Sequence, residues 1–360
     1  RKYMQDVKSQ ENHENGTMKD NECIRVKDAK NCLLCGNEGI LLYNDLRDPL
    51  FSAPGIWALM QCPKCQLFWL NPQPIPDDIG KLYSTYFTHH KPNSDPKLIM
   101  GGFRKFVRES ILQYSYNYKM DGSNSAIGLI FSRIGFLKEI AGSGVRWIEF
   151  KEKGRLLDVG CGDGSFLNRM KQLGWDVMGV EPDEKAVSVA REKFGLEVFH
   201  GSLEEAKFSD MQFDAITMNH VIEHVPNPIE QLTECLRVLK PGGKLMVATP
   251  NINSLGHHVF GQYWRGLEVP RHITLFSPPA LRSCTERVGL NVEDLRTASW
   301  SAPWMWAASS FIRRDGILPG GLPKDLSLWM RLQGMAFRIR EHGIRGPRES
   351  GEVLIMMARR

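Results

Sequence analysis

The stretch Arg155-Leu156-Leu157-Asp158-Val159-Gly160-Cys161-Gly162-Asp163-Gly164-Ser165-Phe166-Leu167-Asn168-Arg169-Met170 runs from an apolar strand pattern through three closely spaced glycines into a helical pattern. Such glycines let the backbone approach a ligand closely, and free N–H groups at the start of the helix favour a carboxylate or phosphate. A second strand pattern follows and ends in Glu181, whose carboxylate can accept hydrogen bonds from both hydroxyls of a ribose. Together these features predict a site for an adenosine-containing ligand.

The acidic residue Asp158, just before the glycines, separates two classes of nucleotide site. Dinucleotide folds favour Gly-x-Gly-x-x-Gly and receive a pyrophosphate, next to which a second anion is unfavourable. A carboxylate here suits a ligand with an ammonium group. The amino-acid part of S-adenosylmethionine has such a group beside its carboxylate, so the residues favour that ligand over a dinucleotide.

Short apolar runs alternate with amphipathic segments from Arg155 to the end of the chain. The runs are 156–159, 177–180, 196–199, 215–218 and 244–248, with 291–295 and 353–357 completing the series. Strands separated by helices indicate an α/β fold, here a doubly wound, mostly parallel sheet of seven strands of the Rossmann-like type. We expect residues 151–360 to form this domain, with an insertion at about 301–345.

Four motifs, in this order, resemble the class I S-adenosylmethionine-dependent methyltransferases, in the branch that contains quinone-biosynthesis O-methyltransferases and many methyltransferases of polysaccharide and antibiotic pathways. The motifs are 157–164, 179–182, 213–216 with 220–225, and 236–245. The resemblance covers residues 150–290. It implies that S-adenosylmethionine is bound by Asp158, Gly160, Cys161, Gly162, Glu181, Pro182, Ser202, Leu203, Asn219 and His220.

In that resemblance Asp158 and the glycines contact the methionine part and Glu181 the ribose. Ser202 and Leu203 flank the adenine, and Asn219 and His220 line the sulfonium. For Leu203 and Asn219, plain packing or loop capping is an equal alternative.

A weakly acidic acceptor needs a base, and histidine titrates nearest neutrality. His220, His224 and His272 all follow predicted strands, at the sheet edge where α/β folds bind ligands. His224 could instead only fasten its loop. Tyr263, Trp264 and Arg271 precede His272 in the sequence and suit a polar or anionic acceptor. Arg271 is either a clamp for phosphate or carboxylate, or a surface ion-pair residue.

Four cysteines form two Cys-x-x-Cys pairs, Cys32 with Cys35 and Cys62 with Cys65. Two such turns complete a tetrahedral zinc site, and four protein ligands leave no open position, so the zinc is expected to be structural. We therefore predict a small four-cysteine zinc-ribbon module at residues 31–76, which either braces the fold or helps to present the acceptor. The other four cysteines show no pairing pattern.

Three segments lie outside these units. Residues 1–30 are polar and predict a disordered leader, and residues 77–150 show helical patterns that predict a linker region. In the insertion, Trp304 and Trp306 and the stretch 328–340 combine large apolar groups with arginines. We interpret this segment as a lid; a helix resting on a membrane surface or covering a lipid-linked acceptor is the alternative.

The net charge of +5 is mild, and no apolar run is long enough to span a bilayer, so we expect a cytoplasmic protein without nucleic-acid partners. The leading hypothesis is an enzyme of polysaccharide or small-molecule biosynthesis that methylates an oxygen of a small-molecule or glycan acceptor. Sugar C-methylation, RNA base methylation and a non-enzymatic zinc-ribbon binding protein remain alternatives. The sequence does not indicate an oligomeric state.

Overall fold

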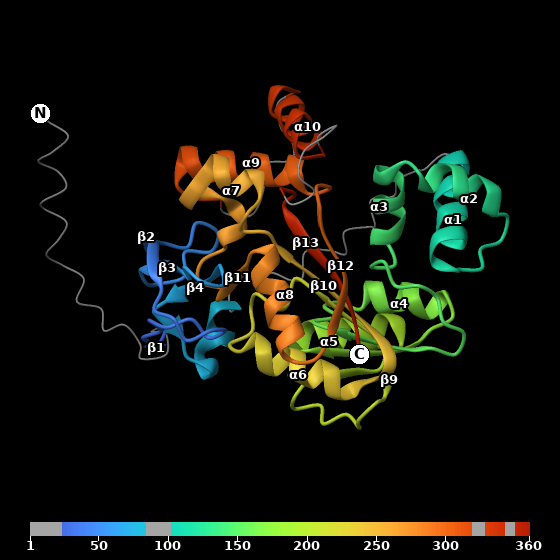
Figure 1. Ribbon diagram of the computed structural model, residues 1–360, viewed down its shortest axis with the longest axis horizontal. Helices are drawn as coiled ribbons and strands as arrows, with labels where there is room; N and C mark the ends of the chain where they lie inside the picture. The colour runs from blue at the N-terminus through green and yellow to red at the C-terminus, as the bar shows by residue number, and fades with distance from the viewer. Residues whose placement is uncertain (1–23, 84–101, 319–327, 343–349) are drawn as a thin grey trace, which may run out of the picture.

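The computed structural model describes residues 24–83, 102–318, 328–342 and 350–360 (Figure 1). Most of the leader predicted at residues 1–30 therefore lies outside the described residues. The chain folds around one large sheet, with a smaller sheet beside it and two groups of helices at one end.

The large sheet has seven strands in the order β12-β13-β10-β9-β6-β7-β8. Neighbouring strands from β10 to β8 are parallel, while β13 is antiparallel to both β10 and β12. The predicted α/β fold with a mostly parallel seven-stranded sheet is confirmed. The strands are β6 (Arg155–Val159), β7 (Asp176–Glu181), β8 (Val198–His200), β9 (Phe213–Asn219), β10 (Leu239–Pro250), β12 (Asn291–Ala298) and β13 (Val353–Arg359).

Helices cover both faces of this sheet because neighbouring residues of a strand point to opposite sides. Leu156 belongs to the buried cluster that contains α4 (Ser165–Gln172) and α5 (Glu184–Phe194). Leu157 belongs to the cluster on the other face, with α6 (Pro228–Val238) and α8 (Pro278–Arg287). The sheet is therefore doubly wound.

The smaller sheet belongs to the cysteine module but takes its fourth strand from elsewhere in the chain. Its order is β11-β4-β3-β2, with β2 (Ile40–Leu46), β3 (Trp57–Gln61), β4 (Leu67–Asn71) and β11 (Thr274–Phe276). The short strands β1 (Val26–Lys27) and β5 (Gln73–Pro74) pair separately. In the sequence β11 lies between β10 and β12, which are strands of the large sheet, but it pairs with β4 of the module. This pairing attaches the module directly to the domain of the large sheet.

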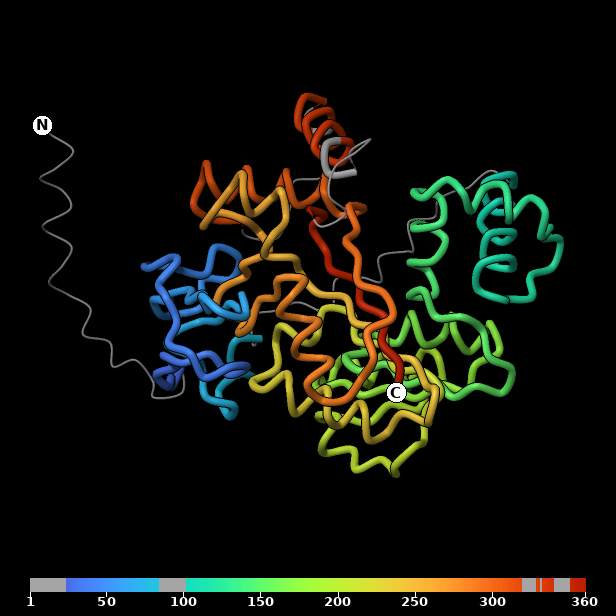
Figure 2. The backbone as a smooth tube through the Cα atoms, in the orientation of Figure 1, coloured from blue at the N-terminus to red at the C-terminus, as the bar shows by residue number. Residues whose placement is uncertain are grey.

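Two helical groups stand at the end of the sheet where the parallel strands finish (Figures 1 and 2). In Figure 1, β13 runs down to the C-terminus, so its antiparallel neighbour β10 and the strands parallel to β10 end at the top. The first group contains α1 (Gly102–Tyr116), α2 (Ser125–Ser132) and α3 (Gly135–Ser143). The second contains α7 (Leu255–Phe260), α9 (Ala302–Asp315) and α10 (Leu328–His342). Within the described ranges, no helix combines the length and apolarity needed to cross a bilayer.

Three short 3-10 helices complete the elements: η1 (Pro76–Tyr83), η2 (Gly261–Tyr263) and η3 (Arg265–Leu267). Helix α7 joins the second helical group to the cysteine module through His257. Its Nδ1 lies 2.6 Å from the Ile252 carbonyl oxygen, and its Nε2 lies 3.0 Å from the Tyr43 hydroxyl. Burial lowers the pKa of His257 to about 4, so the imidazole is neutral near neutral pH.

The buried His257 makes stability depend on pH. The unfolded imidazole takes up a proton below about pH 6.5, whereas the folded one resists it down to about 4. We expect the free energy of unfolding to decrease as the pH is lowered from about 6.5 to about 4. In His257→Gln this decrease should be smaller, as measured by urea denaturation at several pH values. His258→Gln, an exposed neighbour in α7, should keep the wild-type slope. Equal slopes in wild type and His257→Gln would contradict this account.

Candidate active site

The glycine loop connects β6 to α4 and needs a backbone that favours glycine. Gly160, Gly162 and Gly164 have φ values of +69°, +55° and +78°. A Cβ atom at Gly160 would lie 2.5 Å from Cγ2 of Val221, whereas a Cβ at Gly162 would meet nothing within 4 Å. The backbone N–H groups of Gly160 and Cys161 both donate to the Val180 carbonyl oxygen, at 2.8 and 3.1 Å. Hydrogen bonds thus fix the start of the loop, whereas the space beside Cα of Gly162 is empty.

Glu181 ends β7 and lies directly under this loop. Its Oε2 accepts a hydrogen bond from the Gly162 N–H at 2.8 Å, and its Oε1 accepts one from the Asp183 N–H at 3.0 Å. Burial raises the pKa of Glu181, and these two donors oppose the increase. The structure therefore brings together the loop and the carboxylate that the sequence singled out.

Asp158 is fully buried at the end of β6. Its Oδ1 accepts a hydrogen bond from the Thr217 hydroxyl at 2.7 Å and is paired with the Arg146 guanidinium. Burial raises the pKa of Asp158, and the charge of Arg146 opposes the increase. Among the described residues, its Oδ2 is buried without a hydrogen-bond partner. A buried acceptor of this kind fits the ammonium group expected there, since unpaired buried acceptors are costly.

Arg146 is a site residue that the sequence reasoning missed. It lies before β6, outside every motif, and its guanidinium also stacks 3.7 Å from the centroid of the Phe166 ring. Its φ of +48° is unusual for a residue other than glycine. No spacing signal marks this arginine, because its role depends on how the chain turns before β6.

The residues predicted to flank the adenine lie beyond β8. The Ser202 N–H donates to Glu205 Oε2 at 2.7 Å, and Leu203 is buried in the core cluster that contains Leu157. The Pro182 carbonyl lies 3.1 Å from Nε2 of His200. For Leu203 this burial suits packing as well as contact with a ligand, and its role stays a prediction.

The three candidate bases, although up to 52 positions apart in the sequence, come together around the buried Glu223. His220 directly follows Asn219, the last residue of β9, and its Nδ1 lies 3.1 Å from Glu223 Oε1. The rings of His224 and His272 have centroids 4.7 Å apart, and these two residues and Glu223 have ligand atoms within 4.8 Å of one another. The sequence predicted each histidine but not the carboxylate that links them.

Glu223 remains ionised although it is fully buried. Burial alone would raise its pKa, but the hydrogen bond from His220 and the neighbouring histidine charges hold the pKa at about 2. The Thr249 hydroxyl donates to its Oε2 at 2.9 Å. His272 differs, because burial lowers its pKa to about 4 and its Nδ1 lies 2.8 Å from the Gly266 carbonyl oxygen. His224 Nδ1 lies 3.1 Å from the Arg271 carbonyl oxygen and 2.8 Å from the Tyr83 hydroxyl.

The predicted acceptor residues separate into exposed and buried ones. Tyr263 is 38% exposed, but the Trp264 ring is buried and its Nε1–H donates to Glu352 at 2.7 Å. Arg271 is 1% exposed and donates to both oxygens of Asp48 at 2.8 Å. This arrangement favours the ion pair over the anion clamp, but the pair is buried and not at the surface as expected from the sequence.

The four predicted metal-ligand cysteines form one cluster. Cys32 and Cys65 have sulfurs 3.4 Å apart, Cys35 and Cys62 have sulfurs 3.3 Å apart, and all four lie within 4.8 Å of one another. Zinc–sulfur bonds of about 2.3 Å place the sulfurs of a tetrahedral site about 3.8 Å apart, so the cluster fits this metal. The other three described cysteines, Cys161, Cys235 and Cys284, are buried free thiols.

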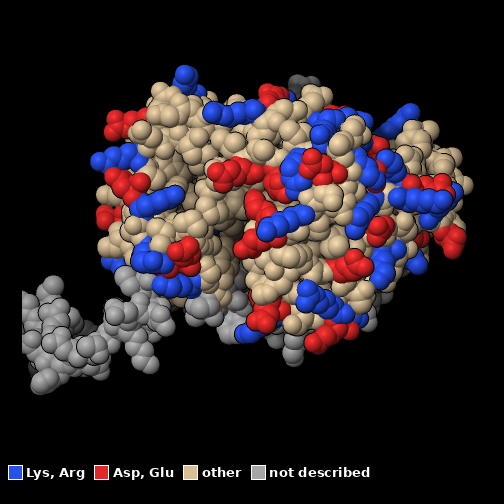
Figure 3. All heavy atoms as spheres, turned by 90° about the horizontal axis from the view of Figure 1, so that it is seen from below, with Lys and Arg blue, Asp and Glu red and all other residues tan. Residues whose placement is uncertain are grey.

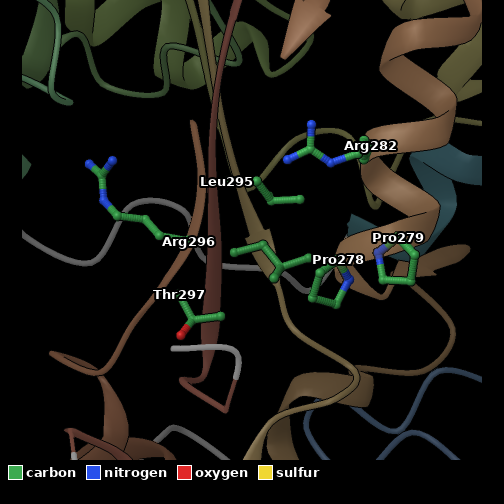
Figure 4. Close-up of a pocket in the computed structure, with 7 residues that line it drawn as sticks. Pro278, Pro279, Arg282, Leu295, Arg296 and Thr297 are labelled. Carbon is green, nitrogen blue, oxygen red and sulfur yellow. The ribbon is translucent and has the colours of Figure 1, made fainter. Parts of the chain in front are cut away.

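A separate depression of about 260 Å³ lies between α8 and β12, away from the glycine loop (Figure 4). Its lining includes Pro278, Leu295 and Thr297, and the side chains of Arg282 and Arg296 extend in different directions. None of the residues discussed above lines it, so we assign it no part in the site.

The doubly wound sheet, the glycine loop and the acidic residues at the ends of β6 and β7 define an α/β nucleoside-binding domain of the class I methyltransferase type. Residues 136–295 match a family model described as a methyltransferase domain. A curated O-methyltransferase is also 30% identical to this chain over 68% of that enzyme's length, and the chain belongs to the S-adenosylmethionine-dependent methyltransferases. It is thus an enzyme of that family, and S-adenosylmethionine is the cofactor of its fold.

Two curated relatives carry the same description. The ubiquinone biosynthesis O-methyltransferase of Cereibacter sphaeroides is 30% identical over 167 residues, which cover 43% of this chain and 68% of that enzyme. The enzyme of the same description from Dinoroseobacter shibae is 40% identical over 104 residues, covering 28% of this chain and 42% of that enzyme.

Solved structures of methyltransferases are also similar. One from Thermotoga maritima, described as a SAM-dependent methyltransferase and possible histamine N-methyltransferase, has a TM-score of 0.41 and 20% identity, covering 71% of this chain and 97% of that chain. A SAM-dependent methyltransferase from Archaeoglobus fulgidus has a TM-score of 0.40 and 18% identity, with coverages of 69% and 98%.

Glu181 allows a direct test of the cofactor pocket. We expect Glu181→Ala to weaken binding of S-adenosylhomocysteine by about 10- to 100-fold, because the ribose hydroxyls lose a charged acceptor. Isothermal titration calorimetry measures the effect. Glu184→Ala, at an exposed position in α5, is the matched control and should bind as wild type does. Unchanged affinity in Glu181→Ala would place the ribose elsewhere.

The cysteine cluster predicts about one zinc per chain by metal analysis. Cys62→Ser should lose the zinc and lower the melting temperature of the whole chain in a single transition, because Leu67 and Trp69 share a core with the large sheet. Cys235→Ser, another buried thiol but outside the cluster, should keep the metal. Zinc-free wild-type protein with an unchanged melting temperature would argue against a structural metal.

Proposed function

We propose that this methyltransferase transfers the methyl group of S-adenosylmethionine to an oxygen of a small-molecule acceptor, with His220 as the general base. The observation that carries the proposal is the contact between His220 and the buried, ionised Glu223. His220 is the first residue after β9. Since β9 pairs with β6 up to Met218 opposite Val159, the backbone of His220 follows β9 at the same edge of the sheet as the glycine loop.

The Glu223 carboxylate sets the state of the His220 ring. A carboxylate accepts hydrogen bonds, so Nδ1 carries the hydrogen of the neutral imidazole and Nε2 is left as the acceptor. The side chain of His220 is 41% exposed, whereas that of Glu223 is fully buried. His220 also has a φ of +57°, a costly backbone conformation of the kind that clusters at functional sites.

The other residues hold the reactants. S-adenosylmethionine supplies an activated methyl group when bound. Asp158 Oδ2 would accept hydrogen bonds from its ammonium group and Glu181 from its ribose hydroxyls. Asn219 and His220, at the end of β9, would border the sulfonium, and the close approach of Val221 to Gly160 would help to exclude water. In this arrangement His224 and His272 support the loop and do not take the proton.

The choice of oxygen is supported by the relatives, whose names state O-methylation in ubiquinone biosynthesis. These names give no support to the glycan acceptor and polysaccharide pathway expected from the sequence, and we do not propose them. We further propose that zinc in the cysteine cluster is structural, because four thiolates complete its coordination.

His220→Gly tests the base, and glycine suits the positive φ at this position. We expect kcat to fall by about 10²- to 10⁴-fold and free imidazole to restore part of the activity. Methyl transfer from labelled cofactor to a panel of phenolic and catechol acceptors provides the measurement. His258→Gln is the control and should neither lose activity nor respond to imidazole. A wild-type kcat in His220→Gly would exclude His220 as the base.

A further inference from the structure

Helix α10 presents an unpartnered apolar stripe. Leu328, Leu332, Met335 and Ile339 follow one another at intervals of four, three and four residues, and Trp329 stands beside the first of them. Their exposures are 73% for Leu328, 68% for Trp329, 49% for Leu332, 54% for Met335 and 67% for Ile339. Since 3.6 residues make a helical turn, these side chains share one face.

Among the described residues, close contacts that hold α10 in place come from side chains outside this stripe. The helix packs on α9 through other residues, with the Phe337 ring 4.7 Å from that of Trp306. A Cβ at Gly334 would lie 2.9 Å from Cα of Pro303, so the two helices cross closely at this glycine. The stripe is therefore free for a contact outside the chain's own core.

A second exposed apolar surface lies on the first helical group. Helix α2 contains no charged residue, yet Leu129 is 37% and Ile130 60% exposed, and Ile134 beyond it is 49% exposed. We call the stripe of α10 and this surface, Leu129, Ile130 and Ile134, the apolar rim. Contiguous exposed apolar patches on soluble domains mark sites of contact with a partner or a membrane.

The helical groups that carry the two parts of the rim touch each other through a contact between α10 and α3. The guanidinium of Arg338 in α10 lies 4.4 Å from the centroid of the Phe136 ring in α3. Both helical groups stand where the parallel strands end, above the glycine loop (Figure 1). The rim therefore borders the end of the sheet from which an acceptor must enter.

The charge around the rim has one sign. Residues 102–143 contain six Lys and Arg against three Asp and Glu, and the described side chains of α9 and α10 include three arginines against one acidic residue. The combined excess of five positive charges equals the net charge of the entire chain, which is five. On the face seen from below in Figure 3, basic and acidic side chains are mixed. The basic excess is thus concentrated at the rim.

We propose that the apolar rim docks on an anionic membrane surface, with α10 lying in the plane of the interface. Apolar side chains with tryptophan on one face and a basic surround are the features of interfacial helices. Docking would turn the active-site end toward the lipid, where an apolar acceptor dissolves. A second copy of the chain is a poorer occupant, because pairing rim to rim would bring two basic surfaces together.

The proposal is tested by co-sedimentation of the full chain with vesicles, without any acceptor, so its outcome is independent of the proposed O-methylation. The probes are phosphatidylcholine vesicles with and without about 30% phosphatidylglycerol. We expect binding only to the anionic vesicles, weakened by salt, and reduced at least about tenfold in Leu332→Glu/Ile339→Glu.

The matched control is Ile40→Glu/Leu41→Glu, which places the same two charges at exposed apolar positions of β2. It should bind vesicles within about twofold of wild type, and both variants should bind S-adenosylhomocysteine normally, which verifies folding. Wild-type protein that stays in the supernatant would overturn the proposal. So would equal losses in both variants, or a dimer in sedimentation velocity that only the α10 variant dissociates.

Discussion

The parallel pairing of β6 between β7 and β9 is the constraint on which the site depends. Its register places Asp158 opposite Gly179 on one side and Thr217 on the other. The Thr217 hydroxyl therefore reaches Asp158, and the loop after β6 passes over Glu181 at the end of β7. A slip of one residue would move Asp158 to the other face of the sheet and separate these groups.

A buried ionic cluster connects this site to the cysteine module. Arg271, next to His272, donates to both oxygens of Asp48 and also pairs with Glu268 at 3.3 Å. Removing one partner of such a buried pair typically costs about 3–5 kcal/mol, because the other charge is left uncompensated. Together with the pairing of β11 and β4, the cluster fixes the loop of His272 to the module. Of the two roles expected for the module, this arrangement favours bracing of the fold.

The end of the molecule that holds the site is thus built from distant parts of the chain. The cysteine module supports one side, the helices α1–α3 and Arg146 approach from another, and α9 with α10 stand beside them. Each unit contributes a different physical element: a rigid support, an arginine that pairs with the buried Asp158, and an exposed apolar surface. Catalytic geometry and access to the site therefore depend on separate elements of the same fold.

The sequence by itself determined the features that are encoded locally. The strand and helix patterns, the glycine loop, Glu181 and the two Cys-x-x-Cys turns each follow from residues close together in the chain, because backbone conformation and periodicity are local properties. Tertiary structure alone decided that Glu223 joins three histidines, that Arg146 pairs with Asp158, that Arg271 is buried against Asp48, and that β11 completes the sheet of the module. Arg146 and Asp158 are 12 positions apart and Asp48 and Arg271 are 223 apart, and the energy of these two contacts comes from burial and charge pairing that no local pattern specifies.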